Sequence, residues 1–258
     1  MARKLNRKSD RRILVVTSDW HAGHKLGLMN PETVLYSQRI DGKGQGKIEQ
    51  MDYTLGEFQR YLWHDVWIPG IERVKELAAG CPIGVIVNGD ITHGNKYPEQ
   101  LVTTSVANQF LIAEGNVQPW LAMPNVNLLR FAIGTNSHIF GEATSPVIVS
   151  ELLKPKYPKV NIGTVHHGLL DVMGVRVDYA HHGPSQGIRE WTKGNQLRYY
   201  LKSIMSGALK NGEKPPAINQ VNRIMATNQL LRANRIRRPL VIPVRNVLDN
   251  LFRLEMVK

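Results

Sequence analysis

The stretch Gly84-Val-Ile-Val-Asn-Gly-Asp-Ile-Thr-His-Gly94 decides how the rest of the chain is interpreted. Its first half is a short, β-branched apolar run, which is typical of a buried strand. The run stops abruptly at Asn88-Gly89-Asp90, which places the carboxylate of Asp90 at the carboxyl end of that strand. Open α/β sheets bind their ligands at this end of their strands. The stretch therefore predicts an α/β domain with a site at Asp90.

Three further apolar runs end in the same way, each with Asp, His or Asn just after it. They are Ile13–Val16 followed by Ser18-Asp19-Trp20-His21, Leu128–Ile133 followed by Gly134-Thr135-Asn136-Ser137-His138, and Val175–Ala180 followed by His181-His182. Oxygen donors mixed with imidazole suit manganese, iron or zinc better than an all-oxygen magnesium or calcium cage. We expect the four strand ends to converge on one metal site, built from Asp19, His21, Asp90, Asn136, His138 and His182.

Two metal ions about 3.5–4 Å apart clamp the attacking and leaving oxygens of a displacement at phosphorus. Such a pair needs a bridging carboxylate, and Asp90 is the expected bridge. An Asp or His at a single strand end is more often a cap or a hydrogen-bonding residue than a ligand. Agreement among four strand ends favours the metal-site interpretation.

The remaining pattern predicts a layered α/β sandwich rather than a barrel of eight repeats. Helices are expected over residues 30–40, 49–79 with an interruption at Pro69-Gly70, 98–121, a short segment ending at 151–154, and 195–209. Strands are expected over 168–173 and 175–180, joined by a tight turn at Gly174. Trp63, Trp67 and His64 are interpreted as packing residues, and Cys81 as a buried, inert thiol.

The net charge of +12 is concentrated at the two ends of the chain. Residues 1–12 hold six Lys or Arg and one acid, and residues 217–258 hold eight and two, which leaves 19 basic and 18 acidic residues between them. We therefore divide the chain into a basic arm (1–12), a nearly neutral domain (13–216) and a basic C-terminal segment (217–258). Such ends could hold phosphate backbones, or they could be solvated tails with no specific partner.

The motif order resembles that of the calcineurin-like metallophosphoesterases, particularly their small phage-type members, over roughly residues 12–216. The family pattern runs Asp-x-His, Gly-Asp, Gly-Asn-His, His-Gly and Gly-His-x-His; Asp19-Trp20-His21, Gly89-Asp90 and His182-Gly183 resemble the first, second and fourth elements. The resemblance implies an α/β/β/α sandwich with mixed sheets and two divalent ions. It further implies Asp19 and His21 on one ion, Asp90 between both, Asn136 and His182 on the second, and His138 as the proton donor.

Two motifs depart from the family pattern. In Gly134-Thr135-Asn136-Ser137-His138 the Asn and His are separated by one residue, and the final Gly-His-x-His is missing because no histidine follows His182. From Ala217 to Lys258 there is also no glycine. This compositional break suggests that residues 217–258 are not the ancestral end of the fold. We expect His181 to substitute at most in part for a missing ligand, because one strand end rarely supplies two ligands with both rings correctly aimed.

The function expected from these residues is hydrolysis of a phosphoester, a diester rather than a monoester, by a metal-bound hydroxide. One alternative is a catalytically weakened member of the family that binds nucleic acid through its basic ends. Another is a truncated product whose lost terminal strand leaves an exposed sheet edge. No apolar run approaches the roughly 20 residues of a membrane helix, and the first residues lack a signal core. We therefore expect a cytoplasmic, phage- or prophage-encoded protein with a phosphoester, nucleotide or nucleic-acid substrate and no membrane partner.

Other candidate positions have two interpretations each. Residues 41–47, Asp-Gly-Lys-Gly-Gln-Gly-Lys, fail the spacing of a nucleotide-binding P-loop and are expected to form a flap. His24 and His93 follow Asp19 and Asp90, and either support the site or lie in surface loops. Arg189, Trp191 and Lys193 either contact a phosphate or a base, or belong to a solvated loop. His166 and His167 are expected to be structural or surface residues.

Overall fold

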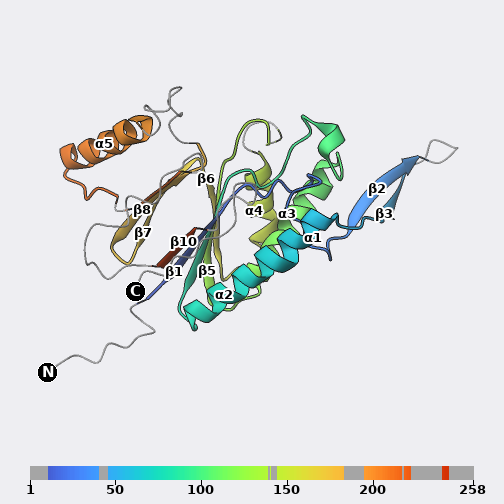
Figure 1. Cartoon of the computed structure of the whole chain (residues 1–258), viewed down its shortest axis with the longest axis horizontal. Coiled ribbons are helices and arrows are strands. Elements are labelled where there is room, and N and C mark those ends of the chain that lie inside the picture. Colours follow the sequence, from blue (N-terminus) through green and yellow to red (C-terminus); the bar gives the residue numbers. More distant parts are fainter. Residues whose placement is uncertain are drawn as a thin grey trace.

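The central element is a parallel sheet whose strand order is β10-β1-β4-β5-β6 (Figure 1). The computed structural model describes residues 11–40, 46–138, 140, 144–182, 195–216, 218–221 and 240–243. The strands are β1(Ile13–Thr17), β4(Ile83–Asn88), β5(Val126–Ala132), β6(Asn161–Val165) and β10(Leu240–Pro243). Every residue of β1 and β4 is buried. Continuous apolar strands of this kind form parallel sheets that are covered on both faces.

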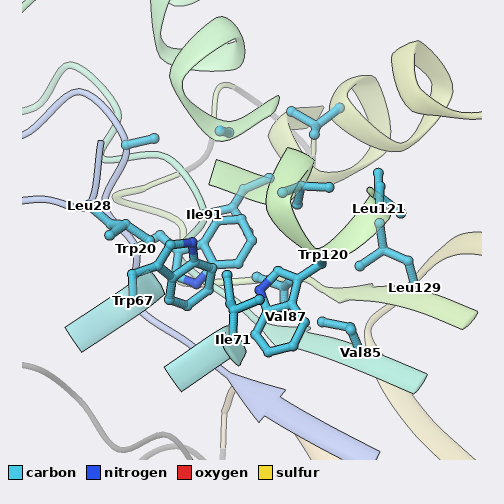
Figure 2. Packing of buried hydrophobic residues seen from close by; sticks show 14 of the residues in the cluster. Trp20, Leu28, Trp67, Ile71, Val85, Val87, Ile91, Trp120, Leu121 and Leu129 are labelled. Carbon is cyan, nitrogen blue, oxygen red and sulfur yellow. The ribbon is translucent and has the colours of Figure 1, made fainter. Parts of the chain in front are cut away.

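Helices cover one face of this sheet. They are α1(Glu57–Tyr61), the π-helical segment η1(Leu62–Trp67), α2(Ile68–Ala78), α3(Val106–Leu121) and α4(Thr144–Leu153), with a 3₁₀ turn η2(Pro98–Gln100) before α3. Figure 2 shows Trp67 and Ile71 packed toward Trp120, Val87 and Val85 of the core. Trp67 and Trp120 meet edge to face, with ring centroids 5.8 Å apart, an arrangement that aromatic pairs favour.

A second sheet lies against the other face of the central sheet. Its strands are β7(His167–Val172), β8(Val175–Ala180) and β9(Ile218–Val221), in the order β7-β8-β9. Leu14, Val16 and Ile86 form one buried cluster with Val177 and Tyr179 of β8. Helix α5(Asn195–Lys210) lies beyond this sheet, on the side away from α3 and α4 (Figure 1). The protein is therefore an α/β protein with layered elements.

The pairing of strands is mixed only in the smaller sheet. There β7 and β8 are antiparallel, whereas β8 and β9 are parallel. The central sheet is parallel throughout its described pairs. Two backbone segments of the 217–258 region, β9 and β10, thus pair with β8 and β1. The proposed division of the chain at residues 12 and 216 stays a prediction.

One helix prediction in the first third of the chain is wrong, and a second is wrong about the residue at which the helix begins. Residues 30–40 contain the strand β2(Leu35–Ile40), which pairs with β3(Gly46–Met51) in an antiparallel hairpin that projects from the body (Figure 1). The Asn108 side chain accepts from the Tyr36 backbone N–H (3.0 Å) and donates to its carbonyl (2.7 Å), which holds this segment extended. Helix begins only at Glu57, not at Glu49.

The predicted interruption at Pro69-Gly70 is also wrong. Pro69 lies just after the junction of η1 and α2, where Trp67 and Ile68 both have right-handed helical dihedral angles, so the helix runs on through Pro69. The π-helical segment directly before it is an irregularity of the kind that accommodates the missing N–H of proline. The predicted helix over 98–121 is confirmed from Val106 onward, because residues 98–100 form the 3₁₀ turn η2. The short helix ending near residue 153, the hairpin turning at Gly174 and the helix from Asn195 are confirmed.

Burial tests the predicted packing residues. Cys81, Trp63 and Trp67 are buried, as expected. His64 is exposed, so its interpretation as a packing residue is wrong. Among the helices of the described residues, none is long and apolar enough to cross a membrane.

Candidate metal centre

The loops after β1 and β4 carry backbone strain at three of the predicted site residues. Asp19, His21 and Asp90 have φ angles of 56°, 46° and 50°, and a left-handed non-glycine residue costs roughly 1–3 kcal/mol. Backbone bonds lock the two loops together, because Asp19 N–H donates to Gly89 O (3.1 Å) and His21 N–H donates to Asp90 O (2.9 Å). Strain of this kind persists only where the surroundings enforce it, and it concentrates at functional sites.

Trp20 anchors the first of these loops in the core. Its side chain is buried and meets Trp67 edge to face at 5.3 Å between ring centroids (Figure 2). Asp19 and His21 on either side of it are half-buried. The apolar anchor therefore fixes the positions from which the two polar side chains extend.

The first cluster consists of Asp19, Asp90 and His181, whose ligand atoms all lie within 4.8 Å of one another. We call it the carboxylate group. His181 Nε2 lies 3.0 Å from Asp90 Oδ2. Asp90 Oδ1 accepts from the Thr135 backbone N–H (2.7 Å) and from the Thr135 hydroxyl (3.0 Å). Thr135 thus fixes the orientation of the Asp90 carboxylate. Asp19, Asp90, Thr135 and His181 follow β1, β4, β5 and β8, so the ends of these four strands all contribute to this part of the site.

The Asp90 carboxyl and the His181 imidazole shift each other's protonation. Burial alone would raise the pKa of Asp90, but the His181 hydrogen bond and charge, with His138 and the Thr135 N–H, bring that pKa to about 2. Burial alone would lower the pKa of His181, and the Asp90 carboxylate raises it above its ordinary value. Without a metal ion, the two groups therefore form a buried ion pair.

The second cluster consists of His21, His93 and His138, whose ligand atoms also lie within 4.8 Å of one another. We call it the imidazole group. The Nδ1 atoms of His21 and His93 are 3.4 Å apart, and the His21 and His138 ring centroids are 4.5 Å apart. His21 Nε2 lies 3.9 Å from Asp19 Oδ1. The two groups are therefore adjacent.

Backbone carbonyls orient two of the histidines. His138 Nδ1 lies 2.7 Å from the His93 carbonyl oxygen, and His181 Nδ1 lies 2.7 Å from the Asn88 carbonyl oxygen. A carbonyl oxygen only accepts, so each Nδ1 carries the proton and donates it. In the neutral tautomer the lone pair is on Nε2, which in His138 is available to a metal ion and in His181 faces Asp90 Oδ2. Metal-binding histidines are commonly oriented in this way.

Burial keeps His21 and His93 of the imidazole group uncharged at neutral pH. It lowers the pKa of His21 to about 4, with a further contribution from His138. Burial and the neighbouring rings of His24, His21 and His138 lower the pKa of His93 to about 3. The pKa of His24 is also lowered by burial. Neutral imidazole is the form that binds metal ions.

The structure brings together Asp19, His21, Asp90 and His138 of the predicted site. Asn136 is exposed, and His182 is exposed with its Nε2 3.2 Å from the Gly134 carbonyl oxygen. The other two members of the clusters are His93 and His181, whereas the sequence predicted Asn136 and His182. The predicted ligand roles of Asn136 and His182 stay predictions.

A strand-parity signal in the sequence points to His181. Val177 and Tyr179 of β8 face the central sheet, and residues two apart in a strand share a face. His181 continues this series, whereas His182 belongs to the opposite series. His93 lies in a loop, where no such periodicity applies.

Several predicted positions do not join the clusters or lie outside the described residues. The His24 ring lies against the His93 ring at a tilt, with ring centroids 4.4 Å apart, and its Nδ1 accepts from the Leu26 N–H (3.0 Å). His167 pairs with Asp178, which agrees with a structural role. Residues 41–45 of the predicted flap, Arg189, Trp191, Lys193 and the basic arm 1–10 lie outside the described residues.

Comparisons of the chain with protein-family models, curated protein sequences and solved structures found no match.

Proposed function

We propose that this protein is a metal-dependent phosphoesterase that hydrolyses a phosphodiester in preference to a monoester. We further propose that its layers form an α/β/β/α sandwich of the calcineurin-like kind. The sandwich is supported by the helices on one face of the central sheet, the β7-β8-β9 sheet on the other, and α5 beyond it. The preference for a diester rests on the motif resemblance alone.

The single observation that carries the proposal is the pair of adjacent ligand groups at the strand ends. The carboxylate group offers two carboxylates and one imidazole, and the imidazole group offers three imidazoles. The two groups are adjacent, because His21 Nε2 of the second lies 3.9 Å from Asp19 Oδ1 of the first. Two neighbouring groups of this size match the requirement of two-metal hydrolysis of phosphoesters. Strained backbone and clusters of buried titratable groups are costly, and both concentrate at functional sites.

The donor set also fits divalent ions on its own chemistry. His93 Nε2 is buried without a hydrogen-bond partner in the described part of the chain, which is unusual for a purely structural histidine. Asp19, Asp90 and His181 would hold one ion, and His21, His93 and His138 the other. When bound, the ions would activate a water molecule and neutralise the charge that develops on the phosphoryl oxygens.

The residues of the chain itself position these ligands and restrict their protons. Thr135 holds Asp90 Oδ1 through two hydrogen bonds, so the carboxylate cannot rotate freely. The Asn88 carbonyl holds the proton of His181 at Nδ1. Asp90 stays ionised at neutral pH, because its pKa is about 2. Asp90 is therefore in the protonation state that a metal ion requires, whereas His181 would release its Nε2 proton when an ion binds.

His138 can serve only one of two purposes. Its Nδ1–H donates to the His93 carbonyl, so Nε2 is the atom that either binds an ion or carries a proton to a leaving group. The motif resemblance implies proton donation. A general acid gives a descending basic limb in the pH profile of kcat that disappears in the variant His138→Gln, and this measurement decides between the two uses.

The proposal is tested by manganese-stimulated hydrolysis of bis(p-nitrophenyl) phosphate. We expect the wild-type chain to turn over the diester and Asp90→Asn to lose at least about 100-fold in kcat/KM, in line with the several kcal/mol that metal-ion stabilisation contributes. Asp65→Asn is the matched control, because Asp65 is exposed on η1. Equal turnover by the Asp90 and Asp65 variants, or no metal-dependent turnover by the wild type, would refute the proposal.

A further inference from the structure

The imidazole group differs from the carboxylate group in what it offers to a metal ion. All three of its donors are ring nitrogens, and two of its members, His21 and His138, come from the ends of β1 and β5. Its third member, His93, lies three residues beyond Asp90 and outside the motifs predicted from the sequence to bind metal ions.

The ring of His93 is buried but poorly paired. Only 7% of the residue is exposed. The neighbouring rings are the imidazoles of His21, His24 and His138, whose centroids lie 5.3, 4.4 and 4.8 Å from that of His93. Its Nδ1 faces another imidazole nitrogen, and its Nε2 has no partner in the described residues. A structural histidine at this depth normally bonds to a carbonyl or carboxylate.

The spacing of the nitrogens matches one small cation. Two nitrogen ligands at 2.0–2.1 Å from a tetrahedral zinc ion lie about 3.3–3.4 Å apart. The Nδ1 atoms of His21 and His93 are 3.4 Å apart, so Nδ1 is the atom of each ring that would bind the ion, and the unpartnered Nε2 of His93 would lie outside the coordination sphere. His138 is held with its Nε2 lone pair available by the carbonyl of His93 itself, so one residue provides both a ligand and the orientation of another.

We infer that His21, His93 and His138 form a nitrogen-only site for a borderline transition-metal ion such as Zn²⁺, with His93 as a true ligand. Imidazole-only donor sets favour zinc over manganese or magnesium, whereas carboxylates favour the harder ions. The Asp19, Asp90 and His181 group would then take the harder ion of the pair. This assignment gives His138 to the metal ion rather than to proton transfer. It concerns metal binding alone, so it stands or falls independently of phosphoester hydrolysis.

The first test measures Zn²⁺ affinity of the full chain, stripped of metal, by competition with a chromophoric chelator. We expect His93→Gln and His138→Gln each to weaken binding by about 100-fold or more, since even partners outside the ligand sphere contribute 10–100-fold. His64→Gln, at an exposed histidine, should bind like the wild type. Asp90→Asn should lose less than about 10-fold. Wild-type affinity in His93→Gln, or equal losses in His93→Gln and Asp90→Asn, would overturn the inference.

A second variant covers the case in which His93→Gln fails to fold. His93→Cys keeps a ligand at this position, and Co²⁺ bound to a thiolate shows a charge-transfer band in the near ultraviolet that Co²⁺ on imidazoles does not. We expect this band in His93→Cys and its absence in the wild type and in His64→Cys. A folded His93→Cys protein that binds Co²⁺ without the band would show that residue 93 does not touch the ion.

A third measurement tests which ion each group takes. Mn²⁺ is added to the chain loaded with one equivalent of Zn²⁺, and free Mn²⁺ is followed by its electron paramagnetic resonance signal. We expect one Mn²⁺ to bind, Asp90→Asn to abolish this binding and His93→Gln to retain it. Displacement of the zinc by Mn²⁺ would overturn the assignment of the imidazole group to the softer ion.

Discussion

Gly134 shows how little space surrounds the Asp90 carboxylate. A Cβ atom at this position would lie 2.2 Å from Asp90 Oδ1 and 2.4 Å from the Asp90 backbone nitrogen. Backbone atoms cannot move aside as the end of a flexible side chain can. The end of β5 therefore requires glycine for close approach to the loop after β4.

We predict that Gly134→Ala destabilises the protein by about 1–3 kcal/mol, the usual cost of overpacking, and weakens metal binding by displacing Asp90. Gly70→Ala is the matched control, because a Cβ there meets nothing within 4 Å and lies in helix α2. It should stabilise the chain by about 0.5–1 kcal/mol. Urea unfolding with and without metal measures both effects, and equal stabilities of the two variants would contradict the prediction.

The Asp90–His181 pair predicts a pH dependence for the metal-free protein. The pKa of Asp90 is lowered to about 2, so its contribution to stability is present above the ordinary value of 3.8 and is lost as the pH falls through about 2. The pKa of His181 is raised, so its contribution is present below 6.5 and is lost as the pH rises through the folded-state value. The ion pair therefore stabilises the folded protein most between about pH 3.8 and pH 6.5.

The difference in unfolding free energy between wild type and His181→Gln isolates the contribution of the ion pair. The lowered pKa values of His21 and His93 change stability with pH in the opposite direction, but they do so equally in both proteins. We expect the difference in unfolding free energy in chelator to be largest below pH 6.5 and to shrink as the pH rises above it. His64→Gln should show no such trend. A difference that grows with pH would mean that the ion pair does not form.

At the scale of single elements, α3 acts as the support of the site through its polar side chains. Gln109 is fully buried, and its amide bonds to the Gly94 N–H (3.0 Å), the Gly94 carbonyl (3.3 Å) and Asn95 Oδ1 (3.0 Å). Asn116 on the same helix binds the Leu28 carbonyl and the Asn30 N–H. The loops that carry His21 and His93 are thereby fastened to one rigid helix.

We predict that Gln109→Leu lowers stability by about 1–3 kcal/mol, because it leaves the buried polar groups of the loop at Gly94 unpaired. The same change should weaken Zn²⁺ binding, since His93 immediately precedes this loop. Gln118→Leu on the exposed side of α3 is the control and should alter neither quantity. Thermal unfolding and the chelator competition are the measurements. Unchanged zinc affinity in a destabilised Gln109→Leu protein would show that the loop does not depend on α3.

At the scale of the whole molecule, the strands that end in site residues could be predicted because each is a continuous apolar run followed by polar residues. The hairpin β2–β3 could not, because its extended form depends on Asn108, more than 60 residues away. The choice between His181 and His182 depends on which face of β8 turns inward, and a shift of one residue reverses the face. His93 joins the site only through the folding of a loop, for which the sequence has no periodic signal.

The C-terminal segment provides the last prediction. Backbone pairing of Leu240, Val241 and Ile242 with Ile13, Leu14 and Val15 covers the outer edge of β1, and an uncovered edge of a buried apolar strand promotes association between chains. All residues of the two ligand groups lie between Asp19 and His181. Deleting residues 217–258 should therefore cause aggregation, seen by light scattering, while any soluble monomer keeps its zinc affinity. A monodisperse, equally stable truncated chain would instead favour the view that residues 217–258 are a later addition to a complete fold, whereas loss of zinc binding from a folded monomer would mean that this segment supplies a ligand.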